Sequence, residues 1–551
     1  MIVLICAQWL ALFQDTAAQT LPHQISERLR NRIEAAGIPP KITVQGEPIH
    51  ASVMLPIFYE RRAYRPAWSK DNGPLKQVEG LINGIREAGR EGLRPGDYHL
   101  AEIETTLREV RENQSKKKSL HSGRLVDLDL LLTDAFLIYA SHLLAGRINP
   151  ETIDAEWFAK RREADLAAML QTTLDSGEIE QSLKSLLPPQ LGYARLQQAL
   201  AHYRHLAENS GLPIVPEGPK MQKGDLGERI IALRARLVAT GDLDDRSPDG
   251  GDVFGDALEQ AVLRFQKRHG LDTDGVVGPA TLAALNVSVE ERIRQIEVNM
   301  ERWRWLPQDL GKRYVLVNIA NFELEVVDSG QAVMTMRVVV GRNYRRTPVF
   351  SDKMTYLVLN PSWNIPPSLA VQDMLPELRK DPNYLAEKNI RVFQGWGAEA
   401  KEIDPNTIDW PKVTSENFNY RFRQEPGPAN ALGQIKFMFP NRFNVYLHDT
   451  PSRELFAKAE RAFSSGCIRI EKPIELAIYT LQDNQEWSRE KILTSIDNGT
   501  ERTIPLADPV VIHLLYWTAW AEEDGSIHFR RDLYGRDKRV DEALRQEPPT
   551  S

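Results

Sequence analysis

The sequence is almost without cysteine. Only two occur among its 551 residues, Cys6 and Cys467. Cys6 lies in an apolar N-terminal run, so removal of that run leaves Cys467 alone and excludes a disulfide within the chain. A solitary thiol in an oxidising compartment favours a reactive role, and the alternative is a small buried hydrophobic residue. The residues around Cys467 favour the reactive role.

The chain also lacks a strong excess of one charge. It has 69 basic and 76 acidic residues and a net charge of -7. Such a balance gives no global attraction to nucleic acid or to anionic lipid, so we expect neither as a partner. Hydrophobic residues make up 42% and charged residues 26%, which is typical of folded protein. A folded chain of this length is expected to form about three or four domains.

Long apolar runs are absent beyond the N-terminus. Residues 1–13 are apolar, and small residues follow up to Ala18, which predicts a signal peptide over 1–18 and an exported protein. No Lys or Arg precedes the run, so a misplaced start codon, a retained membrane anchor and a buried helix stay open. A membrane tether is expected only if this segment is not cleaved.

Residues 21–212 have helical periodicity and predict a helical scaffold domain. The segment 128–140 is apolar enough for a buried helix. Proline and glycine at 94–96 and 148–150 separate the elements. His202 and His205 share a helix face, but no third ligand is evident, so a packed or solvated pair is favoured over a metal site.

A linker rich in proline and glycine, 213–224, precedes a compact helical module at 224–288. One apolar stripe comprises Leu226, Ile230, Leu233 and Leu237; a second comprises Ala257, Ala261 and Phe265 and ends at His269 and Gly270. The segments 253–255, 265–271, 274–279 and 281–282 resemble the three-helix peptidoglycan-binding domain. Because its glycines suit turns, the pattern indicates the fold more directly than it indicates binding.

The periodicity changes to that of strands after residue 313. Runs at 314–319, 335–340, 355–359, 434–439 and 444–447 predict a mostly β domain. Residues 371–430 are too long for a plain connection and predict an inserted lid or subdomain. A hairpin across 523–525 is expected to complete or flank the sheet as part of a C-terminal segment, 483–551.

Two short segments carry the chemistry. Residues 446–450 (YLHDT) end a strand, and 464–470 (SSGCIRI) precede a helix that Pro473 opens. An imidazole at His448 can generate the thiolate of Cys467 for attack on a carbonyl. The N–H groups of Gly466 and Cys467 are candidate donors to the developing oxyanion. Arg469 supplies a positive charge for a substrate carboxylate or for lowering the thiol pKa.

These segments resemble the L,D-transpeptidase catalytic domain, over about 313–482. The runs at 361–366 and 435–441, with the two upstream domains, resemble its large periplasmic subgroup. The resemblance implies a multidomain α+β protein: a helical scaffold, a small three-helix peptidoglycan-binding domain and a mostly β catalytic domain with an inserted capping subdomain. Cys467, His448 and Gly466 are the expected catalytic residues. The expected substrate-binding residues are Arg469, Ser464, Ser465, Tyr446 and Asp449.

The chain departs from the family pattern at two of these positions. Many members have His where Ser465 stands and Gly where Asp449 stands. In the family a backbone carbonyl orients the catalytic His, so these changes need not remove the group that orients His448. Asp449 is nevertheless placed to perturb its pKa.

The resemblance implies a periplasmic enzyme of peptidoglycan biosynthesis and cell shape. It would cut a stem tetrapeptide before the terminal D-alanine, form an acyl-enzyme on Cys467 and pass it to a diaminopimelate amine. Stem peptides and glycan are the expected partners, with cell-wall synthesis proteins as a further class to test, and carbapenems are the expected inhibitors. No metal or nucleotide cofactor is expected, since no motif for either appears.

Several alternatives remain from the sequence. An L,D-carboxypeptidase or a lipoprotein-anchoring transpeptidase shares the acyl-enzyme and differs only in its acceptor. A non-catalytic scaffold that binds the cell wall is the alternative from another class. A papain-like protease is disfavoured, because there Cys precedes His in the chain, whereas here His448 precedes Cys467.

Overall fold

The computed structural model describes residues 20–546 apart from 38–39, 72, 117–119, 159, 210, 247–250, 382 and 396. The expected signal peptide and Cys6 lie outside the described residues. The chain divides into two compact units. The first contains Met1–Arg147, Arg162–Pro188 and Leu544–Ser551, and the second contains Ile148–Arg161 and Pro189–Ala543.

The first unit is built around one buried helix, α5 (Ser122–Ala145). Around it lie α1 (Leu21–Glu34), α2 (Met54–Arg61), α3 (Gln77–Arg86), α4 (Leu100–Ser115), α7 (Leu166–Ser176) and α8 (Ile179–Lys184). The prediction of a buried helix at 128–140 is confirmed. Within the described ranges α5 is the one helix long and apolar enough to cross a membrane, but 89% of its apolar window is buried inside the fold. Core packing therefore accounts for its composition.

The expected scaffold domain, 21–212, extends beyond the first compact unit. Helix α9 (Leu191–Asn209) belongs to the second unit, where it packs along α13 (Val289–Arg304). Gly192 allows this close approach, because an added Cβ would stand 2.6 Å from the ring of Trp303. Helical periodicity alone did not show which domain α9 joins.

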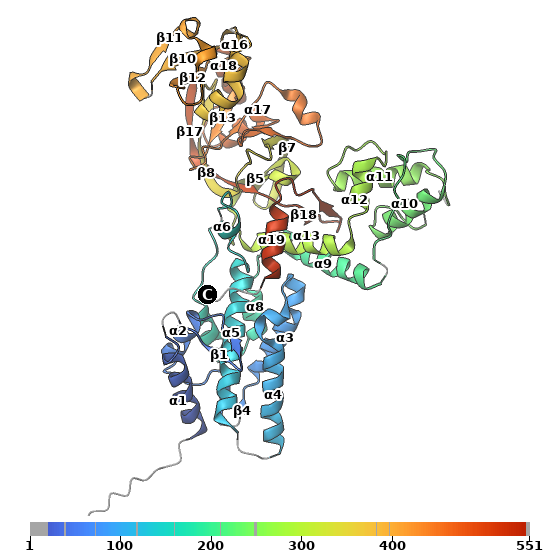
Figure 1. The fold of residues 1–551 in the computed structure, drawn as a ribbon, viewed down its shortest axis with the longest axis vertical. Coiled ribbons are helices and arrows are strands. Elements are labelled where there is room, and N and C mark those ends of the chain that lie inside the picture. Colours follow the sequence, from blue (N-terminus) through green and yellow to red (C-terminus); the bar gives the residue numbers. More distant parts are fainter. Residues whose placement is uncertain are drawn as a thin grey trace, which may run out of the picture. The chain divides into compact units, whose positions relative to one another are not determined.

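The small helical module has the three helices predicted for it, α10 (Glu228–Ala239), α11 (Asp256–Arg268) and α12 (Pro279–Leu285) (Figure 1). Ile230, Leu233, Leu237 and Phe265 lie in its core. Leu226 does not, since it precedes α10 and is 70% exposed. Gly270, with φ 65°, follows α11 in the left-handed conformation that ends many helices.

The β domain contains a sheet of nine strands in the order β15-β7-β16-β14-β13-β8-β17-β5-β6. They are β5 (Arg313–Asn318), β6 (Glu323–Asp328), β7 (Gln331–Gly341), β8 (Phe350–Leu359), β13 (Ile435–Met438), β14 (Leu447–His448), β15 (Ala462–Ser464), β16 (Ile468–Ile470) and β17 (Arg502–Leu515). The expected end of the domain at 482 is too early, because β17 pairs with both β8 and β5 inside the sheet. The C-terminal segment thus contributes a central strand.

The insertion has its own antiparallel sheet, in the order β11-β10-β12-β9. Its strands are β9 (Trp363–Ile365), β10 (Ile390–Gln394), β11 (Lys401–Ile403) and β12 (Tyr420–Gln424). The predicted subdomain is present, but its sheet begins at 363 and not at 371. Ile365, Val392, Trp410 and Phe422 are buried together in its core.

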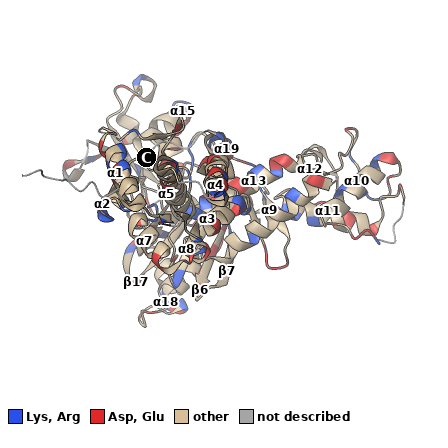
Figure 2. Cartoon of the chain, turned by 90° about the horizontal axis from the view of Figure 1, so that it is seen from below, with Lys and Arg blue, Asp and Glu red and all other residues tan. Residues whose placement is uncertain are grey.

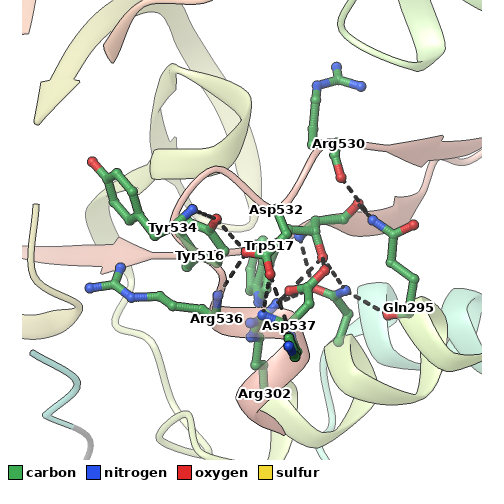
Figure 3. Close-up of polar contacts among 12 residues, drawn as sticks. Gln295, Arg302, Tyr516, Trp517, Arg530, Asp532, Tyr534, Arg536 and Asp537 are labelled. Atoms are coloured by element: carbon green, nitrogen blue, oxygen red, sulfur yellow. Dashed lines mark hydrogen bonds and ion pairs between the residues drawn. The ribbon is translucent and has the colours of Figure 1, made fainter. Parts of the chain in front are cut away.

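The C-terminal segment ends in the hairpin predicted across 523–525, formed by β18 (Ala519–Ala521) and β19 (Ile527–Phe529), and in helix α19 (Arg536–Arg545). Figure 3 shows the polar network that fixes it. Arg302 on α13 donates to Asp537 at 2.6 Å, and Asp532 accepts from the Tyr516 hydroxyl and the Arg536 N–H at 2.8 Å each. Burial raises the pKa of Asp537 to about 6. These bonds fix the segment that carries Tyr534.

Acidic and basic residues are interspersed along the helices seen in Figure 2, as the nearly balanced composition implies. Charge therefore matters through local groupings of side chains and not through the net charge.

Candidate active site

Two adjacent strands bring four residues of the predicted site together. In the parallel pair of β14 and β16, His448 stands beside Arg469, and continuing this register places Cys467 beside Tyr446. The bond from the Ile468 N–H to the Tyr446 carbonyl, 3.1 Å, supports that alignment. Because paired residues share a sheet face and side chains alternate along a strand, these four side chains lie on one face.

Cys467 is half-buried, and its sulfur lies 3.8 Å from the carbonyl oxygen of Asn444. Burial raises the pKa of the thiol, since a thiolate loses its hydration there. Hydrogen bonds from the backbone and hydroxyl of Tyr446, and the charges of Lys436 and Arg469, act in the opposite direction. The resting thiol is therefore protonated, with groups that favour the thiolate already beside it.

His448 is buried, and its Nδ1 lies 2.5 Å from the carbonyl oxygen of Asp449. A carbonyl only accepts, so Nδ1 carries the proton and Nε2 is left as the acceptor. This bond agrees with the expectation that a backbone carbonyl orients the ring. Burial, followed by the charge of Arg469, lowers the pKa of His448 to about 3. The resting pair is thus a neutral thiol and a neutral imidazole.

The turn before Cys467 is closed by its own hydrogen bonds. Gly466 has φ 113°, a conformation that glycine adopts without strain. Its N–H donates to Ser464 Oγ at 3.2 Å, and that hydroxyl donates to the Cys467 carbonyl. The expectation that Gly466 offers its N–H to an oxyanion is therefore not met in this conformation. Ser464, expected to bind substrate, instead shapes the turn.

Thr347 lies behind the same turn and is fully buried. Its hydroxyl accepts from the Gly341 N–H at 2.9 Å and donates to the Gly466 carbonyl at 2.8 Å. Tyr534, from the C-terminal segment, donates to the Gly341 carbonyl and accepts from the Thr347 N–H at 3.3 Å. The network in Figure 3 is therefore continuous with the cysteine turn through Tyr534.

Ser465 contacts the capping insertion through Arg345. The guanidinium of Arg345 donates to Ser465 Oγ at 3.1 Å and to both carboxylate oxygens of Asp373. Asp373 lies in a π-helical turn of the insertion, Ala370–Met374. Ser465 is thus near the edge of the lid.

The carboxylate of Asp449 contacts Gln434 and Arg453. One oxygen accepts from the Gln434 N–H at 2.9 Å, and the other pairs with Arg453 at 3.2 Å. Both oxygens are therefore engaged within the fold. The side chain expected to bind substrate instead stabilises the turn after β14.

Two residues of the site had no role assigned from the sequence. Lys436 on β13 pairs in register with His448, and its ammonium lies 3.9 Å from the ring centre of Tyr446. Trp363 on β9 of the insertion hydrogen-bonds the side chain of Tyr446. Strand alternation was the available signal for Lys436. No local pattern indicated that Trp363 reaches the site.

Arg469 is the group best placed to receive a substrate carboxylate. Burial lowers its pKa, and Arg342 adds repulsion. Its Nε is buried and has no hydrogen-bond partner among the described residues. A substrate carboxylate would stabilise the charge of Arg469 and accept a hydrogen bond from its Nε.

Cys467 and the carbonyl-oriented His448 lie on one sheet face, an arrangement that suits acyl transfer by a cysteine. Family models match three parts of the chain. Residues 312–512 match the L,D-transpeptidase catalytic domain, 227–285 match a peptidoglycan-binding domain, and 54–200 match the scaffold domain found with them. The chain therefore carries an L,D-transpeptidase catalytic domain with its scaffold and peptidoglycan-binding domains.

Two curated relatives are informative. A candidate L,D-transpeptidase of Haemophilus influenzae is 37% identical over 254 residues, which is 46% of this chain and 50% of that protein. The N-acetylmuramoyl-L-alanine amidase CwlM of Mycobacterium tuberculosis is 37% identical over 76 residues, or 12% of this chain and 19% of that protein. The chain thus matches about half the length of the first relative and less of the second.

Two solved structures are similar at low identity. An L,D-transpeptidase of Xylanimonas cellulosilytica is 16% identical and matches 54% of this chain and 99% of its own, with a TM-score of 0.16. An L,D-transpeptidase of Stackebrandtia nassauensis is 14% identical and matches 55% and 96%, with a TM-score of 0.20. At these scores neither contributes to the assignment.

Proposed function

We propose that this chain is a periplasmic L,D-transpeptidase that links the diaminopimelate residues of two peptidoglycan stems. The proposal rests chiefly on one observation: Cys467 and His448 share a sheet face on adjacent strands, and a carbonyl fixes the imidazole tautomer. The expected donor is a tetrapeptide stem, and the expected leaving group is D-alanine.

In the first half-reaction the sulfur of Cys467 attacks the carbonyl carbon before the terminal D-alanine. The thiol proton passes to Nε2 of His448 and then to the departing amine of D-alanine, which leaves a thioester. In the second half-reaction the side-chain amine of another stem attacks the thioester carbonyl. Its proton passes through His448 to the sulfur, and the new amide is released.

A substrate carboxylate at Arg469 would help His448 to act as a base. In the empty site Arg469 is the second cause, after burial, of the low His448 pKa. A bound carboxylate would offset that charge and raise the His448 pKa toward its ordinary value. Proton transfer would then be favoured when donor substrate is present. This coupling limits reaction of the empty enzyme.

The capping insertion supports transpeptidation over hydrolysis. Trp363 contacts Tyr446, and Asp373 is tied to the turn region through Arg345. A covered thioester is protected from water until an amine arrives. L,D-carboxypeptidase and lipoprotein anchoring share the first half-reaction and remain the alternatives.

Muropeptide analysis tests the proposal in a host that lacks such enzymes. Expression of the chain should produce diaminopimelate-to-diaminopimelate cross-links and release D-alanine, and Cys467→Ala should abolish both. Shortened stems without cross-links would instead indicate a carboxypeptidase. A Cys467→Ala variant with full function would identify a non-catalytic scaffold and overturn the proposal.

A further inference from the structure

A second cleft lies outside the Cys467 site, within the second unit. Its volume is about 980 Å³, and it is bounded by the three-helix module, the hairpin β18–β19 and the paired strands β6 and β7. This volume is in the range of sites that take small organic ligands. Neither the catalytic geometry nor the core of either domain requires such a cleft.

The cleft has more basic than acidic side chains in its lining. Its lining has six basic residues, Arg264, Lys267, Arg268, Arg337, Arg461 and Arg530, and four acidic ones, Asp242, Glu323, Glu522 and Asp524. Arg268 pairs with Asp242, and Arg337 pairs with Glu471. In the described part of the chain the other four basic groups form no ion pair.

The three unpaired arginines are held by neutral oxygens. Arg264 donates to the carbonyl of Asp242 at 2.7 Å, Arg461 to the carbonyl of Phe322 at 3.1 Å, and Arg530 to Asn321 Oδ1 at 2.8 Å. Such bonds fix a guanidinium without neutralising it. Burial lowers the pKa of both Arg461 and Arg530 to about 10. An anionic ligand would stabilise these charges.

An aromatic surface stands beside the cations. The rings of Trp520 and His528 are stacked with centroids 5.0 Å apart, and the guanidinium of Arg530 lies 4.7 Å from the Trp520 ring centre. Trp520 lines the cleft and is half-buried, so part of its indole remains accessible. A flat apolar ring suits the C–H face of a sugar, while cations beside it suit carboxylates.

We propose that this cleft binds peptidoglycan away from the reacting bond, with sugar against Trp520 and stem carboxylates against Arg264, Lys267 and their neighbours. The inference rests on the proposed function and adds to it a polymer-holding site shared by the binding module and the catalytic sheet. The acidic lining groups suit the free amine that a diaminopimelate stem also carries. Arg461 immediately precedes β15, so the cleft adjoins the strand that leads to the cysteine turn.

The test compares two charge reversals in the full chain. The cleft variant is Arg264→Glu with Lys267→Glu. The control is Lys220→Glu, in the linker before the module, with Arg246→Glu, in the module; both residues are outside the cleft lining. All four residues are exposed, so neither variant should disturb the core. Trp520→Ala tests the sugar contact separately.

Binding is measured on sacculi stripped of phosphodiester-linked polymers, and turnover on sacculi and on a soluble disaccharide tetrapeptide. We expect the cleft variant to bind sacculi about tenfold more weakly than the control and to turn them over more slowly. Its turnover of the soluble substrate should equal that of the control. Trp520→Ala should show the same split between the two substrates.

Equal binding of both variants to sacculi would overturn the cleft proposal. Two results would overturn peptidoglycan as the ligand of the cleft. One is binding to sacculi only when phosphodiester-linked polymers are present. The other is binding that polyphosphate abolishes and the soluble disaccharide tetrapeptide does not compete for. Failure of the wild-type chain to turn over the soluble substrate would instead count against the proposed function. The two proposals therefore fail in distinguishable ways.

Discussion

The hydroxyl of Thr347 donates to the carbonyl of Gly466, the residue before Cys467, at 2.8 Å. The bond joins the loop after β7 to the cysteine turn. Since the same hydroxyl accepts from the Gly341 N–H, it fixes the turn against the sheet. We expect this contact to hold Cys467 in its reactive position.

Thr347→Val should lower kcat about ten- to a hundredfold with little change in KM, because a small misplacement of a nucleophile is costly. Thr347→Ser keeps the hydroxyl and should retain most activity. Steady-state kinetics on a soluble tetrapeptide measure both variants. Equal losses in Val and Ser would indicate a packing defect and contradict the role in positioning.

Arg469→Gln should weaken donor binding and raise the His448 pKa, because a charge that opposes the imidazolium is removed. Titration of the His448 ring by NMR measures the second effect in the absence of substrate. An unchanged His448 pKa would contradict the proposed electrostatic coupling. Arg342→Gln is a suitable comparison, since Arg342 neighbours Arg469 but is not among the causes of the His448 shift.

The buried neutral state of His448 makes stability depend on pH. Its pKa is about 3 in the folded protein and 6.5 as the ordinary value. Because the folded pKa is the lower one, the stabilising contribution is complete above about pH 6.5 and decreases as the pH falls toward 3. At pH 5 the loss should be about 2 kcal/mol.

Urea unfolding at pH 7 and pH 5 measures this loss. His448→Gln should show a smaller decrease between the two pH values than the wild type, by about that amount. The comparison removes the contribution of His269, which is also buried with a lowered pKa. An equal decrease in the free energy of unfolding of the two proteins between pH 7 and pH 5 would contradict a neutral buried His448.

The Arg345–Asp373 ion pair should limit entry of water beneath the lid. Arg345→Ala should raise the ratio of hydrolysed to cross-linked product, because the insertion loses a contact with the turn region. The pair is partly exposed, so its effect on global stability should be within about 1 kcal/mol. An unchanged product ratio in Arg345→Ala and Asp373→Ala would exclude this role.

Local patterns predicted much of the fold. The alternation of residues 335–340 indicated β7, and the apolar density of 128–140 indicated α5. Strand β6 was missed, although it also alternates, and β17 was not recognised as a central strand. The order of strands depends on long-range pairing that no local window contains.

The candidate site was predictable to a similar extent. The segments around His448 and Cys467 predicted a nucleophile and a base through their chemistry and family resemblance, and the structure places both residues on one sheet face. Their catalytic roles stay a prediction. The roles of Ser464 and Asp449 depend on hydrogen bonds whose direction is visible only in the folded chain. Trp363 and Thr347 reach the site from distant segments, so their contributions could not be read from neighbouring residues.

Intact-protein mass spectrometry with a carbapenem tests the central claim most directly, because an activated thiol should open the strained ring and retain the product. The wild type should gain a single adduct that maps to Cys467. His448→Ala should react much more slowly, and Ser464→Ala and Ser465→Ala should keep a labelled cysteine. No adduct is expected in Cys467→Ala. An adduct that persists in Cys467→Ala, or that maps to a serine, would contradict the assignment of Cys467 as the nucleophile.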